Sequence, residues 1–151
     1  TTTVLKPPRG CHSPASRFIT LVYAIYEPGT GRLTYVNAGQ NPPLIRRRDG
    51  RFERLHGTGI ALGLFENADY TAAETHLAPG DLLVFYSDGI TEAEDPSGQP
   101  LEEHGLELVL ERHADKPPSV IGSEVLAAVQ SHARRARFTD DLTILAVKRS
   151  A

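Results

Sequence analysis

The sequence predicts an α+β fold, in which a largely antiparallel arrangement of strands is followed by two helices and a last strand. Short runs of β-branched and aromatic residues alternate with turns rich in Gly and Pro through the first half of the chain. Helical spacing of apolar residues begins only after residue 100, and one more strand-like run follows it. At 151 residues the chain fits one domain with a sizeable core.

Composition narrows the class of protein. The chain has 40% hydrophobic and 23% charged residues, as globular proteins do, and its net charge of -3 argues against a nucleic-acid partner. Its single cysteine cannot form an internal disulfide, and no apolar run is long enough to cross a membrane. Six histidines occur without the short spacings of a zinc site. We therefore expect a soluble, cytoplasmic protein with no membrane partner.

The first strands form hairpins. Residues 1–17 carry three prolines and are expected to be an irregular lead-in, so the predicted domain covers residues 18–149. Residues 18–26 and 32–36 flank a Pro-Gly turn and predict an antiparallel hairpin. Strands 44–48 and 51–55 follow, joined by Asp49-Gly50. The arginines at 46–48 fit either a phosphorylated partner or, as we favour, a solvated strand edge.

The second half of the chain supplies the centre of the predicted fold. Residues 70–77 alternate as a strand, and the turn at 78–81 predicts that this strand pairs with the apolar run 82–87. Residues 101–113 have apolar side chains at helical spacing, with two acids near the start. A longer helix is predicted to begin at Ser119 as its cap.

Carboxylates stand next to two predicted strands. The run 82–87 ends in Asp88-Gly89, and Asp140-Asp141 leads directly into the strand-like run 142–147. Oxygen ligands of this kind suit a hard divalent cation, and a glycine lets the backbone approach the ion. Asp-Gly is also a common turn dipeptide, so the first pair alone is more typical of a chain reversal.

The ordered set of motifs resembles one family, the bacterial SpoIIE/RsbU-like branch of the metal-dependent PPM-type Ser/Thr protein phosphatases. The motifs are FITLVYA at 18–24, NAGQNPP at 37–43, GIALG at 59–63, APGD at 78–81, YSDGITEA at 86–93 and DDLT at 140–143. The resemblance implies a sandwich of two antiparallel β-sheets flanked by helices. It also implies hydrolysis of phosphoserine or phosphothreonine on a bacterial regulatory protein, such as a STAS-type anti-anti-sigma factor.

The resemblance also implies the site. Two Mn²⁺ or Mg²⁺ ions would be held by aspartates and water, with Asp88 and Asp140 as the catalytic ligands. Asp141 would support the second ion, and Gly89 would lie against the metal site. Two-metal activation of water then accounts for the expected reaction.

The sequence departs from the family pattern in three places. Gln40 stands where histidine is usual, and Ala61 stands where proline is usual. The upstream motif Asp-x-x-Gly-His-Gly is absent, so the resemblance covers the C-terminal two-thirds of the family domain. We therefore expect weak metal binding by this chain alone and sheet edges that could pair in a homo-oligomer. Two alternatives remain open: a catalytically silent, phosphatase-like module that binds a partner, and a metal-free α+β binding module.

Overall fold

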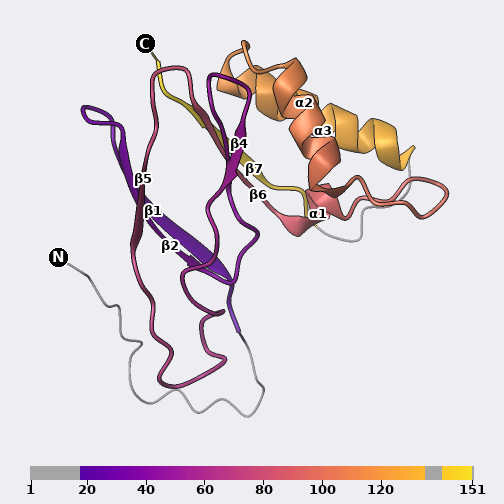
Figure 1. Cartoon of the computed structure of the whole chain (residues 1–151). Coiled ribbons are helices and arrows are strands. Elements are labelled where there is room, and N and C mark those ends of the chain that lie inside the picture. The colour runs from indigo at the N-terminus through magenta and orange to yellow at the C-terminus, as the bar shows by residue number, and fades with distance from the viewer. Residues whose placement is uncertain (1–17, 135–140, 151) are drawn as a thin grey trace. The chain divides into compact units, whose positions relative to one another are not determined.

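The computed structural model describes residues 18–134 and 141–150 (Figure 1). The predicted lead-in 1–17 and Asp140 lie outside these residues. The chain divides into two compact units. Of the described residues, one unit contains 18–42 together with Leu55–Leu77, and the other contains Pro43–Arg54 together with 78–134 and 141–150. Each unit is built around its own sheet.

The first unit contains a three-stranded antiparallel sheet in the order β1-β2-β5. The strands are β1 (Leu21–Glu27), β2 (Arg32–Ala38) and β5 (Ala73–His76). The hairpin predicted for the first two strands is confirmed, with Glu27 opposite Arg32 next to the turn. β2 is the inner strand, and its Leu33 and Tyr35 are buried.

The predicted pairing of strand 70–77 with strand 82–87 is wrong. β5 pairs with β2, where Leu33 lies opposite Thr75. The physical reason is that the strand at residues 82–86 already has a neighbour on each side, so neither of its edges is free for β5. The Ala78–Asp81 turn therefore connects two sheets instead of closing a hairpin.

The second unit contains a four-stranded antiparallel sheet in the order β4-β3-β6-β7. Its strands are β3 (Leu44–Arg46), β4 (Phe52–Arg54), β6 (Leu82–Tyr86) and β7 (Ile144–Lys148). β6 is an inner strand and is apolar along its whole length, as its sequence predicted. The edges of the two sheets are β1 and β5 in one and β4 and β7 in the other. Pairing of these edges with a second copy stays a prediction.

Among the described residues, three helices follow β6: α1 (Asp88–Thr91), α2 (Glu102–Arg112) and α3 (Pro118–Ala133). α2 agrees with its predicted bounds to within one residue at each end. Ser119 is not the cap of α3, because Pro117 occupies the N-cap and Pro118 is the first helical residue. Proline suits this position because its fixed φ is helical and it lacks an N–H that would go unpaired there.

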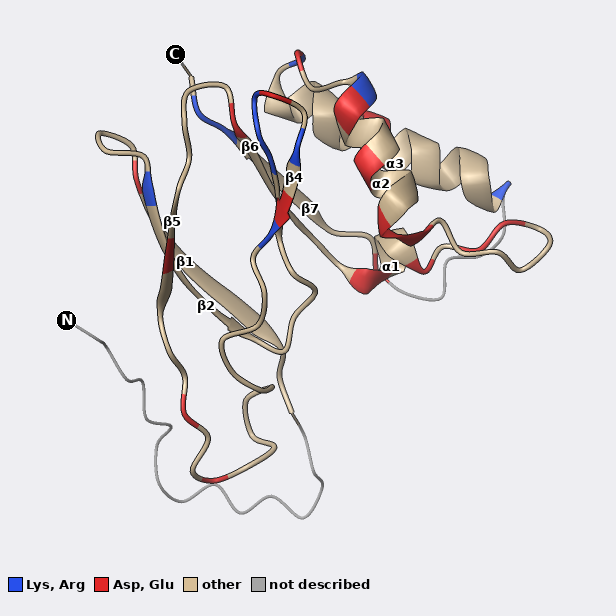
Figure 2. Ribbon diagram, in the orientation of Figure 1, with Lys and Arg blue, Asp and Glu red and all other residues tan. Residues whose placement is uncertain are grey.

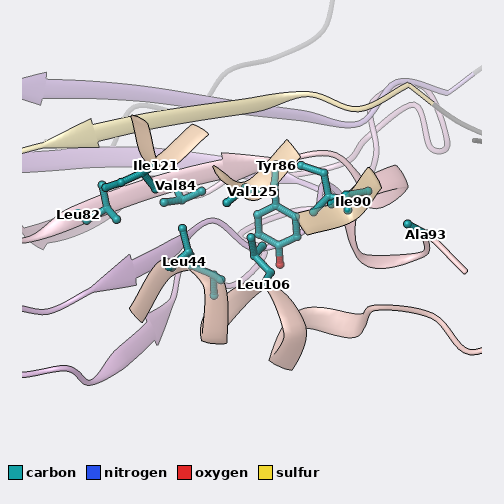
Figure 3. Packing of buried hydrophobic residues seen from close by; sticks show 11 residues of the cluster. Leu44, Leu82, Val84, Tyr86, Ile90, Ala93, Leu106, Ile121 and Val125 are labelled. Carbon is teal, nitrogen blue, oxygen red and sulfur yellow. The ribbon is translucent and has the colours of Figure 1, made fainter. Parts of the chain in front are cut away.

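The core of the second unit lies between one face of its sheet and the helices (Figure 3). Leu82, Val84 and Tyr86 alternate along β6 and point to the same face. The helices contribute apolar residues at helical spacing, including the buried side chains of Ile90, Leu106, Leu110, Ile121, Val125 and Val129. This packing fixes the end of β6, where the predicted site begins. In the described ranges, no helix is both long and apolar enough to span a lipid bilayer.

Candidate active site

Asp88 lies at the junction between β6 and α1. Its side chain is exposed, and its Oδ1 accepts a hydrogen bond from the N–H of Gly89 at 3.0 Å. Two residues further on, Ile90 is fully buried in the core of the unit. The chain therefore turns into one helical turn at Asp88 and does not reverse as a hairpin. The buried Ile90 anchors this turn, so the carboxylate is presented to solvent from a fixed backbone.

Ser87 joins this junction to the segment that precedes β7. Its Oγ donates to the carbonyl of Asp141 at 2.8 Å and accepts from the N–H of Thr143 at 2.9 Å. Its own N–H donates to the carbonyl of Thr143 at 3.0 Å. Asp88 and Asp141 are thereby brought to the same end of the four-stranded sheet, and Asp141 is also exposed.

The segment that follows α1 is acidic (Figure 2). Asp95 orders this loop, because its Oδ1 accepts hydrogen bonds from the Ser97 hydroxyl at 2.6 Å and from the N–H groups of Ser97 and Gln99. The Ser97 hydroxyl, together with these two N–H groups, lowers the pKa of Asp95 to about 2. The carboxylate is thus engaged within its own loop.

The arginine cluster lies at the other end of the same sheet, on the β3–β4 hairpin (Figure 2). Arg46 forms a bidentate pair with Glu111 of α2, at 2.9 and 3.0 Å. Arg47 binds Glu53 and donates to the buried carboxylate of Asp81 at 2.7 Å. A hollow of about 480 Å³ opens here, lined by Arg47, Arg48, Asp49, Arg51, Ala78 and Asp81.

Most arginines of this hairpin form ion pairs with carboxylates of the same chain. Arg51, like Arg46 and Arg47, is paired with a carboxylate of its own chain, in this case Asp49 at 2.8 Å. These contacts do not favour a site for a phosphorylated partner. The predicted solvated strand edge is wrong for Arg46, because β3 lies between β4 and β6 and only 14% of this side chain is exposed.

The residues at the β6–α1 junction offer the type of ligand that a hard cation binds, but too few of them to hold the ion. Asp88 and Asp141 offer carboxylate oxygens, which Mg²⁺ and Mn²⁺ prefer. Within residues 18–134 and 141–150, no three His, Cys, Asp or Glu side chains cluster as they would around a metal ion. A metal site here needs further oxygen ligands, and the predicted one, Asp140, lies outside the described residues.

Comparison with known proteins decides the family. The family model described as Stage II sporulation protein E (SpoIIE) matches residues 9–150. The chain belongs to the SpoIIE family. The bacterial SpoIIE/RsbU-like resemblance inferred from the motifs is therefore confirmed.

Relatives of this SpoIIE-family chain include phosphatases. It is 37% identical over 100 residues to the phosphoserine phosphatase RsbU of Bacillus subtilis, covering 66% of this chain and 30% of RsbU. It resembles the crystal structure of the RsbU and RsbW domains of a Mycobacterium tuberculosis protein with a TM-score of 0.73 and 27% identity, covering 87% of this chain and 36% of that one.

A second solved structure, the phosphatase domain of SpoIIE from Bacillus subtilis, matches with a TM-score of 0.67 and 21% identity, over 87% of this chain and 56% of that one. These structures confirm the α+β fold of antiparallel sheets and helices that the sequence predicted. The SpoIIE-family chain spans less than a third of RsbU and little more than half of the SpoIIE phosphatase domain structure.

One buried polar residue, Asn37, holds a loop of this SpoIIE-family chain, a role that the motif NAGQNPP did not reveal. Asn37 is fully buried at the end of β2. Its Oδ1 accepts from the N–H of Gln40 at 2.9 Å, and its Nδ2 donates to the carbonyls of Gln40 at 3.0 Å and Leu55 at 3.3 Å. The loop therefore depends on backbone atoms of residue 40, so glutamine in place of histidine leaves these contacts intact. The sequence placed Asn37 in a turn directly after the predicted strand 32–36, whereas β2 continues to Ala38 and includes it.

Proposed function

We propose that this chain is part of a metal-dependent protein phosphatase that hydrolyses phosphoserine or phosphothreonine on a regulatory protein. The observation that carries the proposal is the Ser87 link, which brings the exposed carboxylates of Asp88 and Asp141 to one end of the sheet in a SpoIIE-family chain. A named phosphoserine phosphatase, RsbU of Bacillus subtilis, is 37% identical over 100 residues.

The roles proposed for the residues are those that the family resemblance implies. Asp88 would be a ligand shared by or adjacent to both metal ions, with Gly89 leaving the backbone close to them. Asp140 would hold the second ion, and Asp141 would support it. Bound Mn²⁺ or Mg²⁺ would lower the pKa of a coordinated water and offset charge on the phosphate oxygens. Asp88 is exposed, so a phosphorylated side chain of a protein can reach it from solvent.

The regulatory partner is proposed by its chemistry and by the relatives. A phosphoserine or phosphothreonine on a small protein, of which a STAS-type anti-anti-sigma factor is our example, would be the substrate. The relative named a phosphoserine phosphatase supports phosphoserine as the group that is hydrolysed.

The test is Mn²⁺-dependent hydrolysis of p-nitrophenyl phosphate and of a phosphoserine peptide by the natural protein that contains this chain. Asp88→Asn should lower the rate roughly a hundredfold, because it removes a charged ligand of the proposed site. Asp115→Asn is the matched control, since Asp115 is exposed in the turn between α2 and α3. Hydrolysis that survives both EDTA and Asp88→Asn would contradict the proposal. Absence of any hydrolysis would favour a silent module that binds a partner.

A further inference from the structure

At Ser87, where β6 leaves its sheet, a side-chain hydroxyl replaces a backbone carbonyl in the pairing with the segment before β7. The last paired residues of β6 and β7 are Tyr86 and Ile144, so Ser87 stands opposite Thr143. In an antiparallel ladder such a pair can exchange two backbone hydrogen bonds. Here the N–H of Ser87 donates to the carbonyl of Thr143 at 3.0 Å, but the N–H of Thr143 donates to the hydroxyl of Ser87.

The backbone carbonyl of Ser87 is occupied elsewhere. It accepts from the N–H of Ile90 at 3.1 Å, which starts the helical turn of α1. The carbonyl of Ser87 therefore accepts from the helix and not from β7. In its place, the Oγ of Ser87 accepts the hydrogen bond from the N–H of Thr143, at 2.9 Å. The hydroxyl therefore lets the chain pass from strand to helix at Asp88 without losing its hold on the segment before β7.

The hydroxyl also donates a hydrogen bond to the backbone carbonyl of Asp141. The Oγ of Ser87 lies 2.8 Å from the carbonyl oxygen of Asp141, so the main chain of this acidic residue is fixed directly. Asp88 is the next residue after Ser87, and Asp141 is its acceptor. Ser87 is therefore linked to both acidic residues, to Asp88 by the peptide bond and to Asp141 by a hydrogen bond.

We infer that Ser87 is a positioning residue of the proposed metal site, whose hydroxyl sets the placement of Asp141 relative to Asp88. The inference rests on the proposed function. It assigns Ser87 no contact with metal or substrate. Groups that orient metal ligands in this indirect way typically change metal affinity by about 10-fold to 100-fold when they are removed.

The chain offers an isosteric pair of substitutions for the test. Ser87 has φ -85° and ψ 157°, an extended conformation that β-branched residues adopt readily. Ser87→Thr keeps the hydroxyl, and Ser87→Val has the same shape without it. Ser123→Ala is the control for loss of a serine hydroxyl, because the Oγ of Ser123 donates to the carbonyl of Ser119 in α3 at 3.0 Å.

The experiment measures Mn²⁺ binding by electron paramagnetic resonance of the free ion, in the natural protein that contains this chain, with circular dichroism to verify folding. We expect Ser87→Val to weaken Mn²⁺ binding about tenfold and Ser87→Thr to stay within about threefold of the unaltered protein. Ser123→Ala should bind as the unaltered protein does. Hydrogen exchange at the Thr143 amide should accelerate in Ser87→Val alone.

The outcomes separate this inference from the proposed function. Equal Mn²⁺ binding by the Thr and Val variants would overturn the positioning role, even if Asp88→Asn abolishes binding. Equal losses in Ser87→Val and Ser123→Ala would overturn it as well. Mn²⁺ binding without hydrolysis would defeat the phosphatase proposal and leave the positioning role standing. An unaltered protein that binds no Mn²⁺ would overturn both.

Discussion

The carboxylate of Asp81 accepts a hydrogen bond from the guanidinium of Arg47 at 2.7 Å, and only 2% of the Asp81 side chain is exposed. The same carboxylate accepts from the N–H groups of Ala78 and Arg48, each at 2.9 Å. Asp81 therefore joins the turn before β6 to the hairpin between β3 and β4. This junction is structural, and it is the source of our first two predictions.

Removing this carboxylate should destabilise the protein. Asp81→Ala leaves the guanidinium of Arg47 and two N–H groups without their acceptor, which we expect to cost about 3 kcal/mol of the free energy of unfolding. Asp49→Ala removes the exposed pair with Arg51 and should cost about 1 kcal/mol or less. Urea denaturation of both variants makes the comparison, and equal losses would count against a special role for Asp81.

The contribution of Asp81 should also depend on pH. Burial opposes ionisation of this carboxyl, but the hydrogen bonds from Arg47, Ala78 and Arg48 outweigh that effect and lower its pKa. The stabilisation is therefore complete above the unfolded pKa of about 4 and is lost as the pH falls through the lower folded value. The stability difference between the unaltered protein and Asp81→Asn should shrink between pH 5 and pH 2. A difference that stays constant over this range would contradict the assignment.

Gly39 should not tolerate a side chain. Its φ is +76°, and a Cβ built there would lie 2.9 Å from the backbone N of Ala61. Gly39→Ala combines left-handed strain with a clash against backbone, and we expect it to cost about 2 kcal/mol or more. Gly29 has open space around its Cβ position, so Gly29→Ala should change stability by less than about 0.5 kcal/mol. Thermal unfolding of the two variants provides the measurement.

Tyr86 should make the protein less stable as the pH rises into the alkaline range. Burial, reinforced by the hydrogen bond to Glu103 at 2.9 Å, raises the pKa of this phenol. A raised folded pKa gives stability that is complete below the unfolded value of about 10 and is lost as the pH rises further. Tyr86→Phe should be less stable by about 1 kcal/mol at pH 7 and should show a weaker decline above pH 10. Unfolding curves from pH 7 to 11 test both parts, and parallel declines would refute the second.

Much of the fold could be predicted from local patterns. The β-branched and aromatic residues of β1 and the apolar run of β6 identified these strands, and helical spacing located α2. α1 escaped prediction because its four residues are too few to show a helical period. The false partner of β5 followed from its proximity in sequence, whereas the pairing is decided by which strand edges remain free.

The candidate site, too, could be predicted from the sequence only in part. The position of Asp88 at a strand end could be predicted, because an apolar run stops there in a carboxylate. The role of Ser87 could not be predicted. It depends on the register between β6 and β7, and on the Ser87 carbonyl accepting a hydrogen bond from α1. The engagement of Arg46 and Arg47 by acids of their own unit likewise depends on contacts between distant segments.

The link between Ser87 and Thr143 has a consequence for the order of folding. These residues are 56 positions apart in the chain, so their contact closes a long loop and carries its entropy cost. The strand β6 can pair with β3 before β7 joins, but Asp88 and Asp141 come to the same end of the sheet only when β7 has docked. On the ribosome, this junction therefore cannot assemble until β7 has been synthesised and released from the exit tunnel.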